Sequence, residues 1–121
     1  MAFQITMSSA SVNGQDVCIA QLPVSLTFTG AGSNKKRTIT WTLVTNNLLV
    51  EFPTKNGILV VDDANGQINP DNARTDPVTY KAKNKHDAQG DATYVPVILY
   101  RTAAGEAPSV CATGDPKVVN N

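Results

Sequence analysis

The segment "RTITWTLVT", residues 37–45, alternates polar and apolar side chains. In an extended chain Ile39, Trp41 and Leu43 lie on one face, and the threonines between them lie on the other. Threonine, isoleucine and tryptophan are also enriched in strands. We therefore predict a half-buried β-strand with Trp41 in the core.

The same period of two recurs on both sides of this segment. "PVSLTFTG" (residues 23–30) alternates Val24, Leu26 and Phe28 with Ser and Thr, and "VTYKAK" (78–83) alternates apolar residues with Thr and Lys. Each pattern predicts a strand with one buried face. Further strands are predicted at residues 48–52, 57–61, 93–102, 109–113 and 117–120.

Seven or eight short strands, with turn residues between them and no uninterrupted helical pattern, predict an all-β fold. No repeat, low-complexity tract or linker divides the chain, so residues 1–121 are predicted to form one antiparallel β-sandwich domain. Pro96 lacks an N–H, so its strand should be an edge there, carry a bulge, or turn the proline away from a neighbour.

An immunoglobulin-like architecture is the first expectation for this sandwich. Trp41 fits the buried tryptophan of the third strand, and Tyr94 is the candidate tyrosine corner, whose hydroxyl would bond to the backbone. Pro96 occupies the position two residues later where an antibody domain has cysteine, and Cys111 lies a full strand further on. The antibody-type disulfide core is therefore not expected. A cupredoxin-like sandwich is the alternative, without copper because the chain has one His.

Six short motifs occur in order along the chain: "ITWTL" (39–43), "FPTKNGILV" (52–60), "GQI" (66–68), "VTYKAKN" (78–84), "ATYVPVIL" (92–99) and the closing "GDPKVVN" (114–120), with its D-P-x-V/I-x-N ending. Together they resemble the motifs of a group of small, uncharacterised bacterial β-sandwich proteins. The resemblance runs from about Thr38 to Asn121 and departs at Val95–Pro96, where a second tyrosine would fall. It implies a β-sandwich fold and a bacterial origin, and it supplies no catalytic residues.

The charge balance and the hydropathy of the chain restrict the kinds of partner that we expect it to bind. Lys plus Arg and Asp plus Glu number ten each, so no net positive field attracts nucleic acid or an anionic membrane. No apolar run approaches the roughly 20 residues that span a bilayer, and the first residues lack the basic start and apolar core of a signal peptide. We expect a cytoplasmic protein, with secretion after cleavage of a leader as the alternative.

Two cysteines, Cys18 and Cys111, permit one disulfide or two buried thiols. Without a secretion signal the reducing compartment favours free thiols. Zinc and blue-copper sites need several Cys and His ligands, which this chain lacks.

The stretch "VDDANGQINPDN", residues 61–72, is dense in oxygen ligands. Calcium takes six to eight oxygens, which makes this stretch the candidate calcium site. Its spacing departs from an EF-hand loop, however, and Asn65-Gly66 followed by Ile68 is typical of a hairpin turn leading into a short strand. The candidate ligands are Asp62, Asp63, Asn65, Asn69 and Asp71.

No motif for a nucleophile, a phosphate-binding loop or a zinc protease occurs. His86 lies in a polar connection and is predicted to be a solvated loop residue. We therefore expect a non-enzymatic binding or interaction module that contacts a protein partner or a second copy of itself. The alternative is a calcium-dependent module that binds a carbohydrate through its Asp- and Asn-rich loops.

Overall fold

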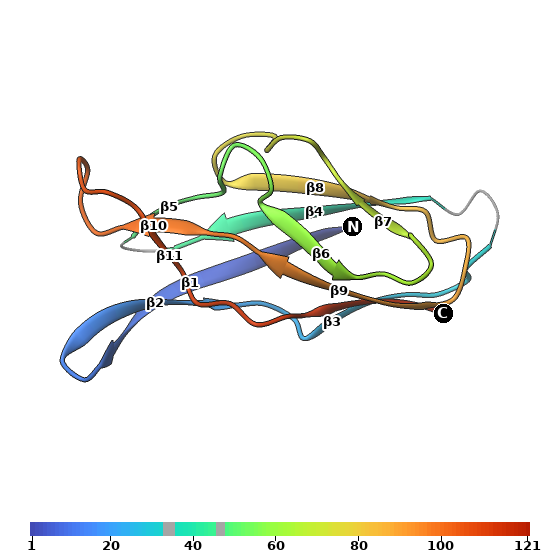
Figure 1. Ribbon diagram of the computed structural model, residues 1–121, viewed down its shortest axis with the longest axis horizontal. Coiled ribbons are helices and arrows are strands. Elements are labelled where there is room, and N and C mark those ends of the chain that lie inside the picture. Colours follow the sequence, from blue (N-terminus) through green and yellow to red (C-terminus); the bar gives the residue numbers. More distant parts are fainter. Residues whose placement is uncertain (33–35, 46–47) are drawn as a thin grey trace.

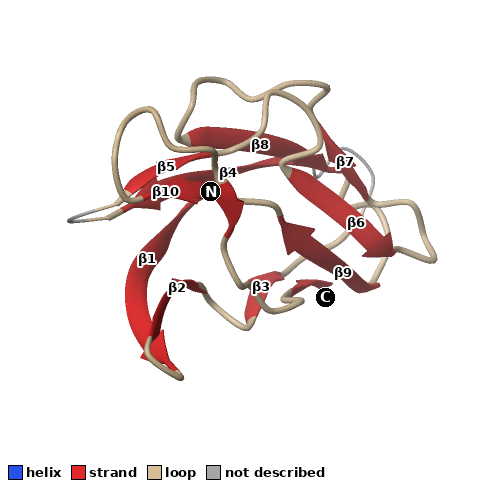
Figure 2. Ribbon diagram, turned by 60° about the vertical axis from the view of Figure 1, so that its left-hand side comes forward, coloured by secondary structure: helices blue, strands red, loops and turns tan. Residues whose placement is uncertain are grey.

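The computed structural model describes residues 1–32, 36–45 and 48–121. Within these residues the fold is all-β, with strands and loops and no helix (Figures 1 and 2). Twelve strands lie in this described part, in the order β1 (Ala2–Val12), β2 (Gln15–Gln21), β3 (Ser25–Phe28), β4 (Arg37–Val44), β5 (Leu49–Glu51), β6 (Ile58–Asp62), β7 (Ile68–Pro70), β8 (Thr79–Asn84), β9 (Gly90–Pro96), β10 (Leu99–Arg101), β11 (Ser109–Val110) and β12 (Lys117–Asn120).

The strands form three sheets around one interior. The first sheet has the order β2-β1-β4-β8-β7, the second β3-β12-β9-β6, and the third β11-β10-β5. Figure 2 shows the strands curling round this interior as a half-barrel, from β1 and β2 over β4 and β8 to β6, β9 and β3.

The predicted antiparallel sandwich is confirmed only as an all-β fold. Two of the pairings are parallel, β1 with β4 and β3 with β12, so the sheets are mixed and the antiparallel prediction is wrong at these places. Both exceptions join strands that are distant in sequence. Direct hairpin connections such as β1–β2 enforce antiparallel pairing, whereas long connections permit either direction.

The segment "RTITWTLVT" forms β4 as predicted. Ile39, Trp41 and Leu43 are buried, because β4 lies inside its sheet between β1 and β8. Leu26 and Phe28 of β3 are buried as well. Val24 departs from the prediction, because it precedes β3 and is 84% exposed.

The long apolar run around Pro96 is two strands instead of one. β9 ends at Pro96 and pairs there with Ile58 of β6, while β10 begins at Leu99 in the third sheet. The proline has no N–H with which to continue the ladder. The chain therefore changes sheets directly after it.

Trp41 and Tyr94 pack together at the centre of the core. Their ring centroids are 5.2 Å apart, and the Trp41 indole N–H donates a hydrogen bond of 3.2 Å to the Tyr94 hydroxyl oxygen. The tyrosine-corner prediction is therefore wrong, because the Tyr94 hydroxyl pairs with a side chain in the opposite sheet. Tyr80 is the buried tyrosine that bonds to the backbone, donating its hydroxyl to the Asp71 carbonyl at 2.7 Å.

The burial of Tyr94 leads us to predict that the stability of the fold decreases in alkaline solution. Burial away from solvent raises the pKa of Tyr94 to about 12. The hydrogen bond from Trp41 lowers this pKa, but its effect is the smaller one. The unfolded chain releases this proton near pH 10. The contribution of Tyr94 to stability is thus fully present below about pH 10 and falls by up to about 3 kcal/mol by about pH 12. Urea unfolding over this range should show the loss.

Tyr94→Phe is the control for this measurement, since it removes the hydroxyl group whose pKa is raised. The variant should be less stable than the wild type at neutral pH, because the Trp41 N–H loses its acceptor. Its stability should nevertheless fall less steeply between about pH 10 and about pH 12. Parallel pH profiles for the two proteins would refute the assignment to Tyr94.

A disulfide joins Cys18 of β2 to Cys111, which follows β11. Both residues are buried, and their Cα atoms are 4.8 Å apart. The Ala112 N–H donates to the Cys18 carbonyl, so backbone pairing holds the two segments in register. The expectation of two free thiols, which rested on the reducing compartment, is therefore wrong for this structure.

Candidate functional site: an apolar groove beside β5

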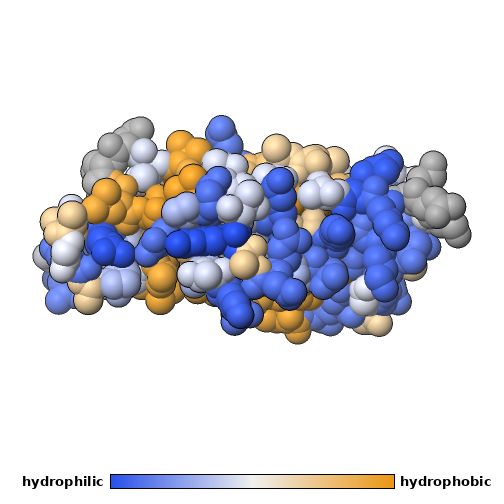
Figure 3. All heavy atoms as spheres, turned by 90° about the horizontal axis from the view of Figure 1, so that it is seen from above, coloured by the Kyte–Doolittle hydropathy of each residue, from blue (hydrophilic) through white to orange (hydrophobic). Residues whose placement is uncertain are grey.

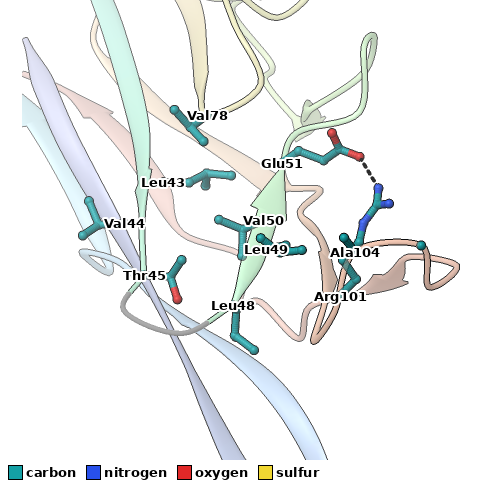
Figure 4. A pocket seen from close by; sticks show the side chains of 11 residues that line it. Leu43, Val44, Thr45, Leu48, Leu49, Val50, Glu51, Val78, Arg101 and Ala104 are labelled. Atoms are coloured by element: carbon teal, nitrogen blue, oxygen red, sulfur yellow. Dashed lines mark hydrogen bonds and ion pairs between the residues drawn. The ribbon is translucent and has the colours of Figure 1, made fainter.

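A groove of about 600 Å³ opens beside β5, at the end of the molecule where β4 ends (Figure 4). Three separate parts of the chain form it: the end of β4 together with β5, the residue directly before β8, and the end of β10 with the loop that follows it. The residues that line it are Leu43, Val44, Thr45, Leu48, Leu49, Val50, Glu51, Val78, Arg101, Ala104 and Gly105.

The walls of the groove are mainly aliphatic. Leu43 and Leu48 are buried at its base, whereas Leu49 and Val78 remain 48% and 36% exposed. Leu49 and Glu51 lie two residues apart on β5 and therefore point to the same face. Figure 3 shows apolar residues gathered at this end of the molecule, while the opposite end is largely hydrophilic on the face in view.

A charged cluster borders these apolar walls. The two carboxylate oxygens of Glu51 accept from different arginines, Oε1 from Arg101 at 3.1 Å and Oε2 from Arg74 at 3.3 Å. Arg74 also donates to the Phe52 carbonyl at 2.8 Å. Both ion pairs are partly solvent-exposed, so they orient the side chains more than they stabilise the fold. The cluster carries one net positive charge.

The acidic stretch adopts a turn in which its side chains bond to the backbone. Asp63 accepts from the N–H groups of Gln67 at 3.0 Å and Ile68 at 2.8 Å. The Gly66 N–H closes the turn onto the Asp63 carbonyl, and Gly66 takes a φ of +59°. Asn65 donates its amide to the Gln89 carbonyl at 2.8 Å. Turn formation therefore engages the carboxylate of Asp63 and the amide of Asn65.

The remaining candidate calcium ligands lie in, or directly after, the two strands that flank this turn. Asp62 ends β6, Asn69 lies in β7, and Asp71 follows β7 and accepts from Tyr80 through its backbone carbonyl. Within residues 1–32, 36–45 and 48–121, no three His, Cys, Asp or Glu side chains are grouped to hold a metal ion. The predicted Asn-Gly hairpin is also wrong, because β6 and β7 belong to different sheets.

His86 is fully buried, which contradicts its prediction as a solvated loop residue. The Asn84 side-chain oxygen accepts its backbone N–H at 3.1 Å, and His86 takes a φ of +53°. This backbone turn directs the ring inward against Phe28, with centroids 5.8 Å apart. Neither ring nitrogen has a hydrogen-bond partner among the described residues. Its burial removes His86 from any surface site.

The groove was not predicted from the sequence. The available signal was the pair Leu48-Leu49, which breaks the alternation: Leu48 is buried directly before β5, and Leu49 is its exposed first residue. Sequence alone does not show that Val78 and Arg101 lie beside that strand. The part of the chain that the structure describes also has no helix with the length and apolar character of a membrane span. Comparisons with models of known families and with curated proteins found no match.

Proposed function

We propose that the chain is a non-enzymatic interaction module that binds a segment of a partner protein in the groove beside β5. The supporting observation is the groove itself, about 600 Å³ in volume, which lies within the range of about 300–1,000 Å³ that is usual for ligand sites. Burying Leu49 and Val78 under a partner segment would remove apolar surface from water, which favours association.

Selection from a displayed library of random peptides tests this proposal. The wild-type protein should enrich peptides rich in apolar residues. The double variant Leu49→Ser, Val78→Ser should lose most binding to them, because both exposed apolar walls are removed. The matched control is Leu59→Ser, Val61→Ser, which changes two exposed apolar residues of β6 outside the groove. Its binding should remain within about twofold of wild type, since exposed sites away from a contact contribute little.

Two results would contradict the proposal that the groove binds a partner segment. Peptides that bind all three proteins equally would place the binding surface elsewhere, and a library that yields no enriched peptide would leave the groove without a peptide function. Sedimentation of the free wild-type protein tests the self-associating form of the proposal. A concentration-dependent dimer that Leu49→Ser, Val78→Ser abolishes would identify the partner as a second copy.

The alternative hypothesis is calcium-dependent binding of a carbohydrate through Asp62, Asp63, Asn65, Asn69 and Asp71. The bonds from Gln67 and Ile68 to Asp63 weigh against it, because they already occupy one lone pair on each oxygen of a carboxylate that calcium would have to share. A thermal midpoint higher in millimolar calcium than in chelator would support this alternative, since a ligand of the folded state alone must stabilise it.

The finer architecture belongs to the same proposal. An immunoglobulin-like sandwich is supported by the packing of Trp41 from the first sheet against Tyr94 from the second, because facing sheets bury their inner side chains against each other. A cupredoxin-like strand order is the alternative.

A further inference from the structure

We infer that Asn13, at the tip of the β1–β2 hairpin, is a site of spontaneous covalent modification by deamidation. The backbone nitrogen of Gly14 attacks the side-chain carbonyl carbon of Asn13 and forms a new N–C bond. The bond from that carbon to the side-chain nitrogen breaks, and this nitrogen leaves as ammonia with the proton of the Gly14 N–H. Water then opens the resulting cyclic imide at either carbonyl group, which gives aspartate or isoaspartate. The site lies outside the groove and does not depend on the function proposed for it.

Three Asn-Gly pairs occur in the chain, and the local sequence makes each of them able to undergo this reaction. Glycine has no Cβ, so it hinders the attack of its own nitrogen less than any other residue. Because each pair offers the same nucleophile and the same leaving group, a difference between them must come from the fold. The pairs are Asn13-Gly14, Asn56-Gly57 and Asn65-Gly66.

In the pair Asn65-Gly66 the fold holds both reacting groups in hydrogen bonds. The side-chain nitrogen of Asn65 donates to the Gln89 carbonyl at 2.8 Å. The Gly66 N–H donates to the Asp63 carbonyl at 3.0 Å. Both bonds must break before the Gly66 nitrogen can reach the side-chain carbon of Asn65, so we expect this pair to react slowly.

In the pair Asn56-Gly57 the glycine is packed into the core. Gly57 is buried, and a Cβ placed on it would lie 2.6 Å from the Tyr80 ring and 3.1 Å from the Phe52 ring. Its carbonyl also accepts from the Val97 N–H at 2.8 Å. Although Asn56 is exposed, movement of the Gly57 nitrogen towards its side chain therefore disturbs the packing of two buried aromatic rings.

The pair Asn13-Gly14 has neither restraint. Both residues are exposed, and a Cβ placed on Gly14 would meet nothing within 4 Å beyond its chain neighbours. Among the described residues, the Gly14 N–H has no backbone acceptor. The nucleophile and the side chain that it attacks are therefore held only by the hairpin turn itself.

This turn lies where the sheet is narrowest. β4 pairs with β1 as far as Thr6, and within the described residues the rest of β1 pairs with β2 alone. A two-stranded hairpin is marginally stable by itself, and Figures 1 and 2 show the tip standing clear of the other strands. The tip can therefore open without unfolding of the domain, which lets the Gly14 nitrogen reach the side chain of Asn13.

Isoaspartate at position 13 would alter the hairpin, because it adds one methylene group to the main chain. The turn joins Val12 to its partner Gln15 through two residues, and both take positive φ, 51° for Asn13 and 78° for Gly14. These values are typical of the tight turns that two residues form, and a longer main chain does not fit them. We expect fraying to extend towards β2 as far as Cys18, which the disulfide anchors.

Parallel ageing of native and unfolded protein tests the inference. The oxidised protein is incubated at mildly alkaline pH with and without guanidinium chloride, and mass spectrometry of proteolytic peptides follows the mass gain at each Asn-Gly pair. In the denaturant the three pairs should react at similar rates, because their local chemistry is the same. In the native protein Asn13 should react at least about tenfold faster than Asn56 or Asn65, which corresponds to a local opening that costs about 1.4 kcal/mol less.

Asn13→Asp separates the added charge from the added methylene group. The variant carries the carboxylate but keeps the normal main chain, so its hairpin should resist a non-specific protease as the fresh wild type does. Aged wild type that contains isoaspartate should be cleaved several-fold faster within residues 8–17. Thermal unfolding should show that the aged protein and the variant are both folded at the temperature of the digestion.

Equal rates at the three pairs of the native protein overturn the inference, because the fold would then not select Asn13. It is also overturned when Asn13 stays intact in the native protein. An aged hairpin that resists the protease as well as Asn13→Asp would refute the expected fraying.

Discussion

Removal of the Cys18–Cys111 disulfide is expected to lower the free energy of unfolding by about 4–5 kcal/mol. The bond links residues that are 93 positions apart, and closing so long a loop restricts the unfolded chain strongly. In thermal unfolding the double variant Cys18→Ala, Cys111→Ala should melt roughly 10–20 °C below the wild type. Denaturant titrations of the two proteins give the free-energy difference directly.

Reduction of the wild-type protein separates the cross-link from the packing of its sulfur atoms. The reduced protein keeps both cysteine side chains, whereas the double alanine variant also loses a small buried volume. The two forms should therefore lie close together and well below the oxidised protein. Reductant should leave the double variant unchanged. A reduced wild type as stable as the oxidised protein would show that the loop-closure argument does not hold here.

Strands whose pattern is local were predicted well from the sequence. β4, β8 and β12 lie where alternation or an apolar run places them, and the inner face of β4 carries Ile39, Trp41 and Leu43. A period of two is a property of each segment, so it survives without knowledge of the neighbours. The all-β class follows from the same signal.

Strands with a weak alternation were missed, and pairing between segments that are distant in sequence could not be derived from local patterns. β1 and β2 were missed although Asn13-Gly14 is a hairpin signal, and both residues take positive φ at the turn. Many of the β1 and β2 side chains are exposed or polar, so the apolar alternation that marks β4 is weak in them. The parallel pairing of β1 with β4 depends on contacts that local patterns do not encode.

The candidate sites differ in the same way: the turn at Asp63 depends on local residues, whereas the groove depends on how distant segments pack. The turn at Asp63 follows from residue chemistry, because Asp and Asn bond readily to nearby backbone groups. The Asp63 bonds to Gln67 and Ile68 realise this preference. The groove, by contrast, joins Leu49 to Val78 and Arg101 across long sequence separations. Only the arrangement of the sheets places these residues side by side.

Replacement of Asn84 by leucine is expected to cost about 3–5 kcal/mol of stability. Asn84 of β8 and Asn120 of β12 are buried and exchange two amide hydrogen bonds, at 2.8 and 2.9 Å, between different sheets. The Asn84 oxygen also accepts from the His86 N–H. Asn84→Leu would leave the side-chain oxygen and the NH₂ group of Asn120 without partners, and the His86 N–H as well. Each buried polar group without a partner costs about 1–3 kcal/mol.

The double variant Asn84→Leu, Asn120→Leu makes the prediction sharper. Removing both amides eliminates the unpaired groups of Asn120, so the second substitution should cost little or restore about 1–2 kcal/mol in the Asn84→Leu background. In the wild-type background Asn120→Leu should instead be destabilising, because the side-chain amide of Asn84 then loses its hydrogen-bond partner. Urea unfolding of the four proteins gives the coupling energy. Additive costs would mean that the two asparagines stabilise the fold independently, whereas strong coupling identifies their reciprocal bond as the polar link between the two sheets.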